Sequence, residues 1–361
     1  MTNLPRRTGT AHLPLHGGKA PAWLFSRMTK LAREITIAIV SDFGPQEMLY
    51  RLSDPYWFQA FGCVLGFDWH SSGVTTTVCG AIKEGIRGME SDLGFFVAGG
   101  KGGASRKTPA EIENAGPLIQ VDTANLVYAS RMSAKVDNNA LQDGYQLYHH
   151  VFCFTKNGDW AVIQQGMNEE NRYARRYHWL GEKVSDFVCE PHSAICAEAT
   201  SGTLNLVAEE SGEARETISD IARQENPDKI MGQLKKLQGL ELPRRHEIIM
   251  QDIHPDRLYK IFVQTYEKQP ENFERLLGMA GVGAKTLRAL SLISEIIYGA
   301  PVSFRDPARF SFAHGGKDGI PYPVDKKTYD RSIEILHNAL ERARIEDKEK
   351  IPALRRLKLW L

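Results

Sequence analysis

The stretch Asn272–Tyr298 constrains the fold most, because two segments with helical spacing meet there at a glycine-rich turn. Apolar residues recur every three or four positions, which predicts an amphipathic helix from Ala284 to about Tyr298. A shorter helix is expected to end at Gly278. Glycines at 281 and 283 accept backbone conformations that a Cβ atom opposes. The turn is therefore expected to present amide N–H groups at a helix N-terminus, an arrangement that binds phosphate.

This stretch resembles the helix-hairpin-helix of base-excision DNA glycosylases, which carry the Gly-Val-Gly-x-Lys pattern seen at Gly281–Lys285. The resemblance covers about residues 270–340. In the bifunctional enzymes the hairpin lysine is the Schiff-base nucleophile and a Val-Asp pair supplies a carboxylate, so the resemblance implies catalytic roles for Lys285 and Asp325. It also implies DNA contacts from four residues of the turn, namely Gly281, Gly283, Lys285 and Thr286.

Two interpretations of Lys285 follow, and the sequence leaves both open. A nucleophilic lysine must be neutral, which requires burial or a nearby cation, and a carboxylate such as Asp325 then stabilises positive charge on the sugar. Alternatively, Lys285 contacts phosphate and Asp325 caps a helix over residues 326–339.

Composition bounds the remaining hypotheses. The chain has 361 residues, 42% of them hydrophobic, which predicts two domains with substantial cores. A net charge of +1 means that any nucleic-acid surface must be a local patch. Five scattered cysteines argue against a disulfide framework, and no apolar stretch approaches membrane-spanning length. We therefore expect a cytoplasmic protein with no membrane contact.

The chain is expected to be α+β. Residues 1–210 form an N-terminal mixed α/β domain, and residues 211–361 form an all-α domain with the helix-hairpin-helix at 272–298. The alternating pattern of Tyr145–Gln165, broken by a polar turn, predicts a β-hairpin in the N-terminal sheet. Two β-branched runs, Ile35–Val40 and Val74–Val78, are also predicted to be short strands.

Three further groups of residues are candidates for function. Asp68 and His70 share one face of a predicted strand end, which suits an acid–base pair or a metal. Asp137 and Asp143 are carboxylates that a divalent metal can bind. The third group comprises cations expected to contact phosphate, in the glycine-rich loop after residue 99 and just beyond the β-hairpin: Lys101, Arg106, Lys107, Arg172, Arg175 and Arg176.

Four segments together resemble the prokaryotic family known as domain of unknown function 763. This resemblance spans nearly the whole chain and implies no activity. The segments are Thr8–Trp23, Phe67–Gly73, Ala140–Asn168 and Gly315–Asp325.

The leading hypothesis is a DNA-binding protein of DNA repair, in enzymatic form a glycosylase/AP lyase that uses Lys285 and Asp325 and needs no cofactor. A second hypothesis is a nuclease on the N-terminal domain that requires Mg²⁺ or Mn²⁺ and uses residues such as Asp68 and His70. The third is a DNA-binding adaptor without turnover. The sequence does not distinguish DNA from RNA, identify a lesion or give an oligomeric state.

Overall fold

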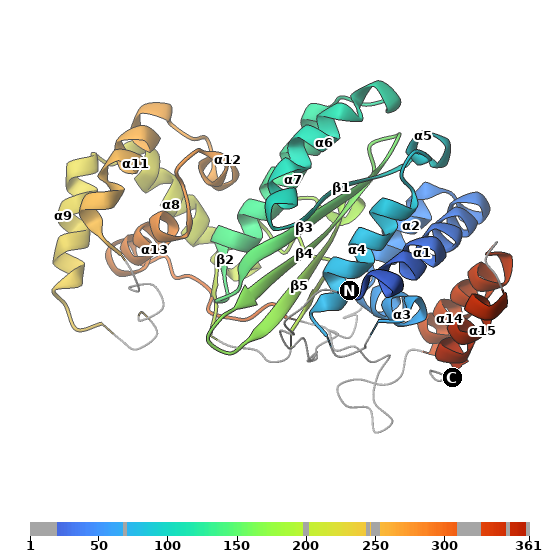
Figure 1. Ribbon diagram of the computed structural model, residues 1–361. Helices are drawn as coiled ribbons and strands as arrows, with labels where there is room; N and C mark the ends of the chain where they lie inside the picture. The colour runs from blue at the N-terminus through green and yellow to red at the C-terminus, as the bar shows by residue number, and fades with distance from the viewer. Residues whose placement is uncertain are drawn as a thin grey trace.

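A computed structural model describes residues 20–67, 71–197, 202–242, 246, 253–308, 326–343 and 347–358. Its centre is a five-stranded antiparallel sheet with the order β1-β3-β4-β5-β6 (Figure 1). The strands are β1 (Phe95–Lys101), β3 (Gln146–Thr155), β4 (Trp160–Asn168), β5 (Tyr173–Leu180) and β6 (Ala194–Cys196). A separate two-stranded ladder joins β2 (Leu141–Gln142) to β7 (Leu204–Asn205). The chain is therefore mixed α and β, as predicted.

The predicted β-hairpin is present as β3 and β4, which pair antiparallel from Gln146 opposite Met167 to Phe154 opposite Trp160. The pairing shifts register between Leu147 and His149. Beyond this shift successive side chains alternate between the two faces of the sheet. His149 and His150 consequently lie on opposite faces, and each face carries its own polar residues.

Four long helices cover one face of the sheet, and the short α5 (Glu90–Leu93) leads into β1. They are α1 (Ala22–Phe43), α2 (Pro45–Ser53), α3 (Pro55–Leu65) and α4 (Gly73–Gly85). The predicted strands Ile35–Val40 and Val74–Val78 are wrong, because both runs are helical. In α1, buried Met28, Leu31 and Ile39 place the β-branched run within a longer stripe of helical spacing. Burial against the sheet thus outweighs the local strand preference.

The opposite face is covered by α6 (Thr108–Asn114) and α7 (Thr123–Lys135), followed by a π-helical turn over Val136–Ala140. Five further helices extend this side of the molecule (Figure 1). One continuous apolar core joins them to α7 and the sheet. They are α8 (Gly212–Gln224), α9 (Pro227–Gln238), α11 (Pro255–Lys268), α12 (Phe273–Gly278) and α13 (Ala284–Tyr298).

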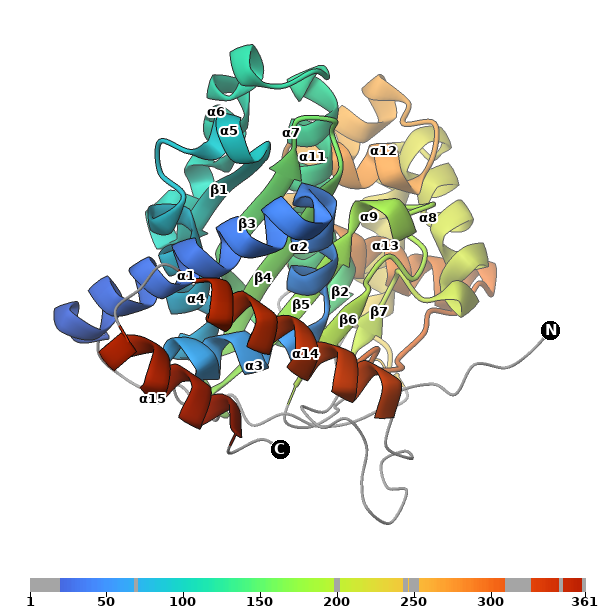
Figure 2. The same ribbon diagram turned by 90° about the vertical axis from the view of Figure 1, so that its right-hand side faces the viewer.

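The last two helices, α14 (Lys326–Arg342) and α15 (Asp347–Lys358), lie beside α1 and α3 (Figure 2). Buried Ile335, Leu336 and Leu340 belong to the same core as α1 to α4. The described part of this end of the chain therefore shares its core with the N-terminal helices, although residues 211–361 were expected to form one unit. None of the described helices is both long and apolar enough to cross a membrane.

Candidate functional site

The glycine turn lies between α12 and α13, whose bounds agree with the sequence prediction. Asn272 caps α12 by accepting a hydrogen bond from the N–H of Arg275 at 2.9 Å. Gly281 has φ +85°, in the left-handed region that favours glycine. Gly283 was expected to need similar freedom, but its φ of −139° and ψ of −173° are open to other residues. Helix α13 begins at this residue without a side-chain cap.

The side chains of the turn differ in their access to a ligand. Lys285 is exposed in the first turn of α13, and Gly281 is exposed as well. Thr286 was expected to contact DNA, but its side chain is buried against the core, so that expectation is wrong for the side chain. Asp325, the expected partner of Lys285, lies outside the described residues.

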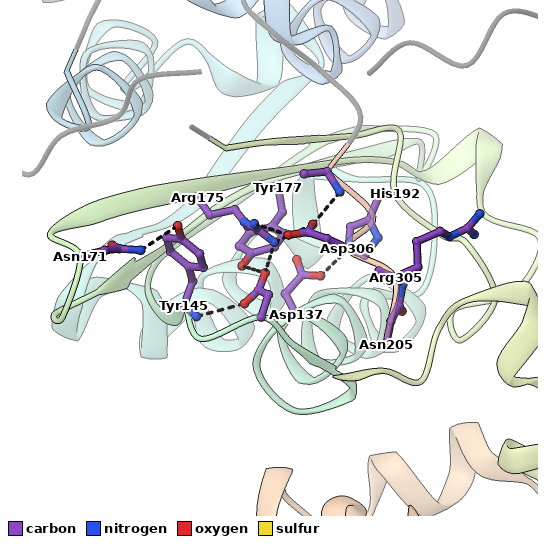
Figure 3. Close-up of polar contacts among 11 residues, drawn as sticks. Asp137, Tyr145, Asn171, Arg175, Tyr177, His192, Asn205, Arg305 and Asp306 are labelled. Carbon is purple, nitrogen blue, oxygen red and sulfur yellow. Dashed lines mark hydrogen bonds and ion pairs between the residues drawn. The ribbon is translucent and has the colours of Figure 1, made fainter. Parts of the chain in front are cut away.

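The expectation that Arg175 and Arg176 contact phosphate is also wrong, because both side chains are fully buried. Arg175 pairs with two carboxylates, at 3.0 Å from Asp143 and 2.8 Å from Asp306 (Figure 3). Arg176 lies on the opposite face, where both of its terminal nitrogens donate to Gln59 Oε1 at 3.1 Å. Two arginines that follow each other in a strand cannot face one surface.

Asp137 and Asp143 belong to separate polar clusters. Asp137 accepts hydrogen bonds from Gln164 Nε2 at 2.5 Å and Trp179 Nε1 at 2.9 Å, and it pairs with His192 (Figure 3). Within the described ranges no three His, Cys, Asp or Glu side chains are grouped to hold a metal. Both carboxylates contact protein groups in this structure, and they do so in two different clusters.

Asp143 is fully enclosed. Burial raises the pKa of its carboxyl group, and the charge of Arg175 acts in the opposite direction. Tyr177 donates its hydroxyl to Asp143 at 2.7 Å, and the backbone N–H of Tyr145 donates at 3.0 Å. The two clusters consequently fix the positions of β5, the turn before β3 and the segment that contains Asp306.

A chain of hydrogen bonds also connects Ser130, His150 and Gln164. The Ser130 hydroxyl lies 2.9 Å from His150 Nε2, and Nδ1 of the same ring lies 2.9 Å from Gln164 Oε1. This connectivity is that of a serine nucleophile with an oriented base. Ser130 lies on the buried face of α7, however, and burial lowers the pKa of His150. We therefore assign these contacts to the attachment of α7 to the sheet.

The face covered by α4 carries an open groove of about 1380 Å³. Its cationic lining residues are Lys83, Lys101 and Arg172. Lys101 and Arg172 are exposed, as are the predicted phosphate contacts Arg106 and Lys107 in the neighbouring 3₁₀-helix Gly102–Lys107. This part of the predicted basic surface is thus accessible to a ligand.

A buried hydrogen-bond network supports the groove from beneath. Gln165 Nε2 donates to the carbonyl of Ser72 at 2.9 Å and to the Tyr148 hydroxyl, and Gln165 Oε1 accepts from Thr75. Thr75 also accepts from Arg176 at 3.4 Å. These contacts hold the N-terminus of α4 against the sheet and set one wall of the groove.

Asp68 and His70 lie outside the described residues, so their predicted pairing is not placed. The residues on either side, Phe67 and Ser71, line the groove. Neither Phe67 nor Ser71 lies in a strand, and the nearest elements on the two sides are helices, α3 up to Leu65 and α4 from Gly73.

The groove and the glycine turn share one end of the sheet. The chain passes from α7 through the π-helical turn to β3, whose Tyr148 lines the groove. Along this path Gln142 Nε2 donates to the carbonyl of Ala284 at 3.1 Å, and Asn138 accepts from the N–H of Leu147 at 3.4 Å. Side chains from residues 138–142 therefore connect α13 with the strand beside the groove.

A family model described as protein of unknown function (DUF763) matches residues 9–324. The chain belongs to the DUF763 family. No curated protein matches the chain, and no solved structure matches it. The DUF763 match includes the sheet, the groove and the α12–α13 turn, and it ends just before α14.

The structural roles of several residues that organise this DUF763 protein escaped the sequence analysis. Lys135, at the end of α7, donates to three carbonyl oxygens of the α12–α13 turn. Gln165 and Asp306 join segments that are far apart in the chain. Only the dense polar composition around the β-hairpin hinted at such networks, and it did not reveal which residues pair.

Proposed function

We propose that the protein binds DNA and acts in DNA repair by holding a phosphate of one strand at the turn between α12 and α13. The observation that carries this proposal is the exposed turn itself, which combines Gly281 in a left-handed conformation with an uncapped helix N-terminus. The first N–H groups of a helix have no partner within the helix, and the helix dipole adds positive potential there. Lys285 places a cation beside these groups.

The exposure of Lys285 favours phosphate contact over covalent catalysis. A Schiff-base lysine must lose its proton before it attacks, and proteins achieve this by removing water or placing a cation nearby. The exposed position of Lys285 in the first turn of α13 meets the requirement for a phosphate contact. The lyase form of the proposal, with Asp325 as the assisting carboxylate, therefore stands second to binding.

The groove offers a continuation of the binding surface. It lies at the same end of the sheet as the turn, and its exposed Lys101 and Arg172 face the solvent. Arg106 and Lys107 add two exposed cations next to it. A strand long enough to reach from the turn to the groove would meet these cations, and a local set of this kind suits a chain with a net charge of only +1.

Binding is tested by fluorescence anisotropy with labelled duplex and single-stranded oligonucleotides over a range of salt concentrations. We expect affinity to fall steeply with salt, and Lys285→Ala to weaken binding and reduce the slope of log K against log salt by about 1. Lys183→Ala is the matched control, because Lys183 is an exposed lysine in the 3₁₀-helix Gly181–Lys183, which follows the C-terminal end of β5. An unchanged slope for Lys285→Ala, or no binding at low salt, would refute the proposal.

Borohydride trapping on DNA with an abasic site tests the lyase form. A Schiff base to Lys285 is reduced to a stable adduct, which should form in EDTA and disappear in Lys285→Ala. An adduct that persists in the variant would exclude this lysine as the nucleophile while leaving the binding proposal intact.

The groove supports a second candidate function, a nuclease that uses Mg²⁺ or Mn²⁺. The supporting observation is that Phe67 and Ser71, which flank Asp68 and His70 in the sequence, line the groove. Cleavage of a supercoiled plasmid with Mg²⁺, with Mn²⁺ and with EDTA separates this function from a lyase. Metal-dependent cleavage that Asp68→Asn abolishes would support it, and cleavage that persists in this variant would contradict it.

A further inference from the structure

One side chain from the sheet-bound part of the chain ends inside the α12–α13 turn. Lys135 Nζ lies 2.7 Å from the carbonyl oxygen of Leu277, 2.6 Å from that of Met279 and 3.3 Å from that of Val282. Lys135 is the last residue of α7, 142 residues before Leu277 in the sequence. The contact therefore joins two helices that the sequence alone does not bring together.

The number of acceptors matches the chemistry of an ammonium group. A protonated lysine has three N–H donors and no acceptor, and here three carbonyl oxygens receive them. A neutral amine would keep a lone pair, which would face a carbonyl oxygen. Burial lowers the pKa of Lys135, and the three carbonyl dipoles favour the charged form. The turn thus encloses a cation through its backbone oxygens.

The same contacts determine which way the amides of the turn point. In a trans peptide the N–H group points opposite to the carbonyl of the same unit. The carbonyls of Met279 and Val282 point inward to Lys135, so the N–H groups of Ala280 and Gly283 point away from it. Among the described residues, neither of these N–H groups donates a hydrogen bond to the backbone. Ala280 is exposed and Gly283 is half-buried.

We propose that Lys135 is a positioning residue, whose ammonium group holds the carbonyl oxygens of the turn inward and thereby directs its amides toward a phosphate. This inference rests on the proposed function for the phosphate, whereas the cation site itself stands on the three contacts. The site is a cup of carbonyl oxygens for a monovalent cation, and the protein fills it with its own side chain. If the side chain is shortened, a free ammonium or potassium ion should occupy the cup, because carbonyl oxygens replace the water around such ions.

The test compares Lys135→Ala, which leaves room for an ion, with Lys135→Met, which fills the space without a charge. Thermal unfolding is measured in ammonium, potassium and choline chloride at one ionic strength. In choline both variants should melt about 4–8 °C below the native protein. Ammonium and potassium should restore at least half of this loss in Lys135→Ala and none in Lys135→Met. Arg131→Ala, an exposed change on the same helix, should melt like the native protein in all three salts.

DNA binding measured in the same salts gives a second readout. Lys135→Ala should bind at least tenfold more weakly in choline and recover toward native affinity in ammonium, while Lys135→Met stays weak. Equal melting temperatures of Lys135→Ala in the three salts overturn the cation site, and so does failure of this variant to fold in all of them. Ion-specific recovery of stability in a protein that ignores DNA would keep the cation site and refute the proposed function. Recovery of stability without recovery of DNA affinity would refute the positioning role.

Discussion

Removal of the buried charge at Arg175 should destabilise the protein more than removal of one of its partners. The guanidinium group donates two hydrogen bonds to Asp306, at 3.0 and 2.8 Å, and one to Asp143, at 3.0 Å. All three side chains are buried, so two carboxylates and the guanidinium group that contacts them lie away from water. Arg175→Met removes the guanidinium group that contacts both carboxylates, whereas Asp306→Ala leaves Asp143 paired with Arg175.

The magnitudes follow from this count. Asp306→Ala removes two charge-assisted bonds of about 1.5–3 kcal/mol each but also removes a negative charge near Asp143, so we expect a loss of about 3 kcal/mol. Arg175→Met should cost about 5 kcal/mol, the upper part of the range for breaking a buried pair. Because burial raises the pKa of Asp143, the extra loss in Arg175→Met should shrink as the pH falls and the Asp143 carboxyl group takes up a proton.

Urea unfolding at pH 7 and pH 5 measures these differences, with constant m values confirming that the midpoints report stability. The double variant completes a thermodynamic cycle, in which the coupling between Arg175 and Asp306 should exceed about 1.5 kcal/mol. If Arg175→Met proves no less stable than Asp306→Ala, or if the two changes simply add, the cluster is not the buried ion network described above.

Two further predictions concern a buried histidine and the glycines of the turn. Burial lowers the pKa of His149 to about 3, below its ordinary 6.5, and its ring nitrogens have no hydrogen-bond partner in the described structure. The stability that depends on neutral His149 is therefore complete above pH 6.5 and declines as the pH falls from 6.5 toward 3. In urea titrations, His149→Leu should lose about 2 kcal/mol less of its free energy of unfolding between pH 7 and pH 5 than the native protein does. If the free energy of unfolding changes equally with pH in the native protein and in His149→Leu, this assignment is contradicted. Gly281→Ala should lower the free energy of unfolding by about 1–2 kcal/mol, because the φ angle of Gly281 is +85°. Gly283→Ala should lower it by less than about 1 kcal/mol, since a Cβ added there meets nothing closer than 3.8 Å. Calorimetry that ranks the two variants in the reverse order would refute the backbone argument.

Local patterns were reliable where neighbouring residues decide the structure. The alternation of Tyr145–Gln165 predicted β3 and β4, and the apolar spacing with its glycines predicted α12 and α13. The strand predictions for Ile35–Val40 and Val74–Val78 failed because a short β-branched run has the same composition in a buried helix as in a buried strand.

Some of the predicted phosphate contacts are exposed and others are buried, and this difference depends on the whole fold. Lys101, Lys285 and Arg172 are exposed, and all three were identified from their place in polar or glycine-rich segments. Arg175 and Arg176 carry the same charge as these exposed residues, but they lie in β5, where both faces of the sheet are covered. A sequence shows that an arginine follows a turn, but it does not show which helix later covers that strand.

The amino-acid sequence by itself determined the glycine turn, the β-hairpin and the basic loop, because each depends on residues within about one helical turn or one strand pair. Tertiary structure decided what these elements face. The ammonium group of Lys135 reaches the turn only because α7 and α12 pack together, and Asp306 meets Arg175 across 131 residues of chain. Buried charges must find partners when the chain collapses, and the choice among partners is made by packing geometry that no local pattern records.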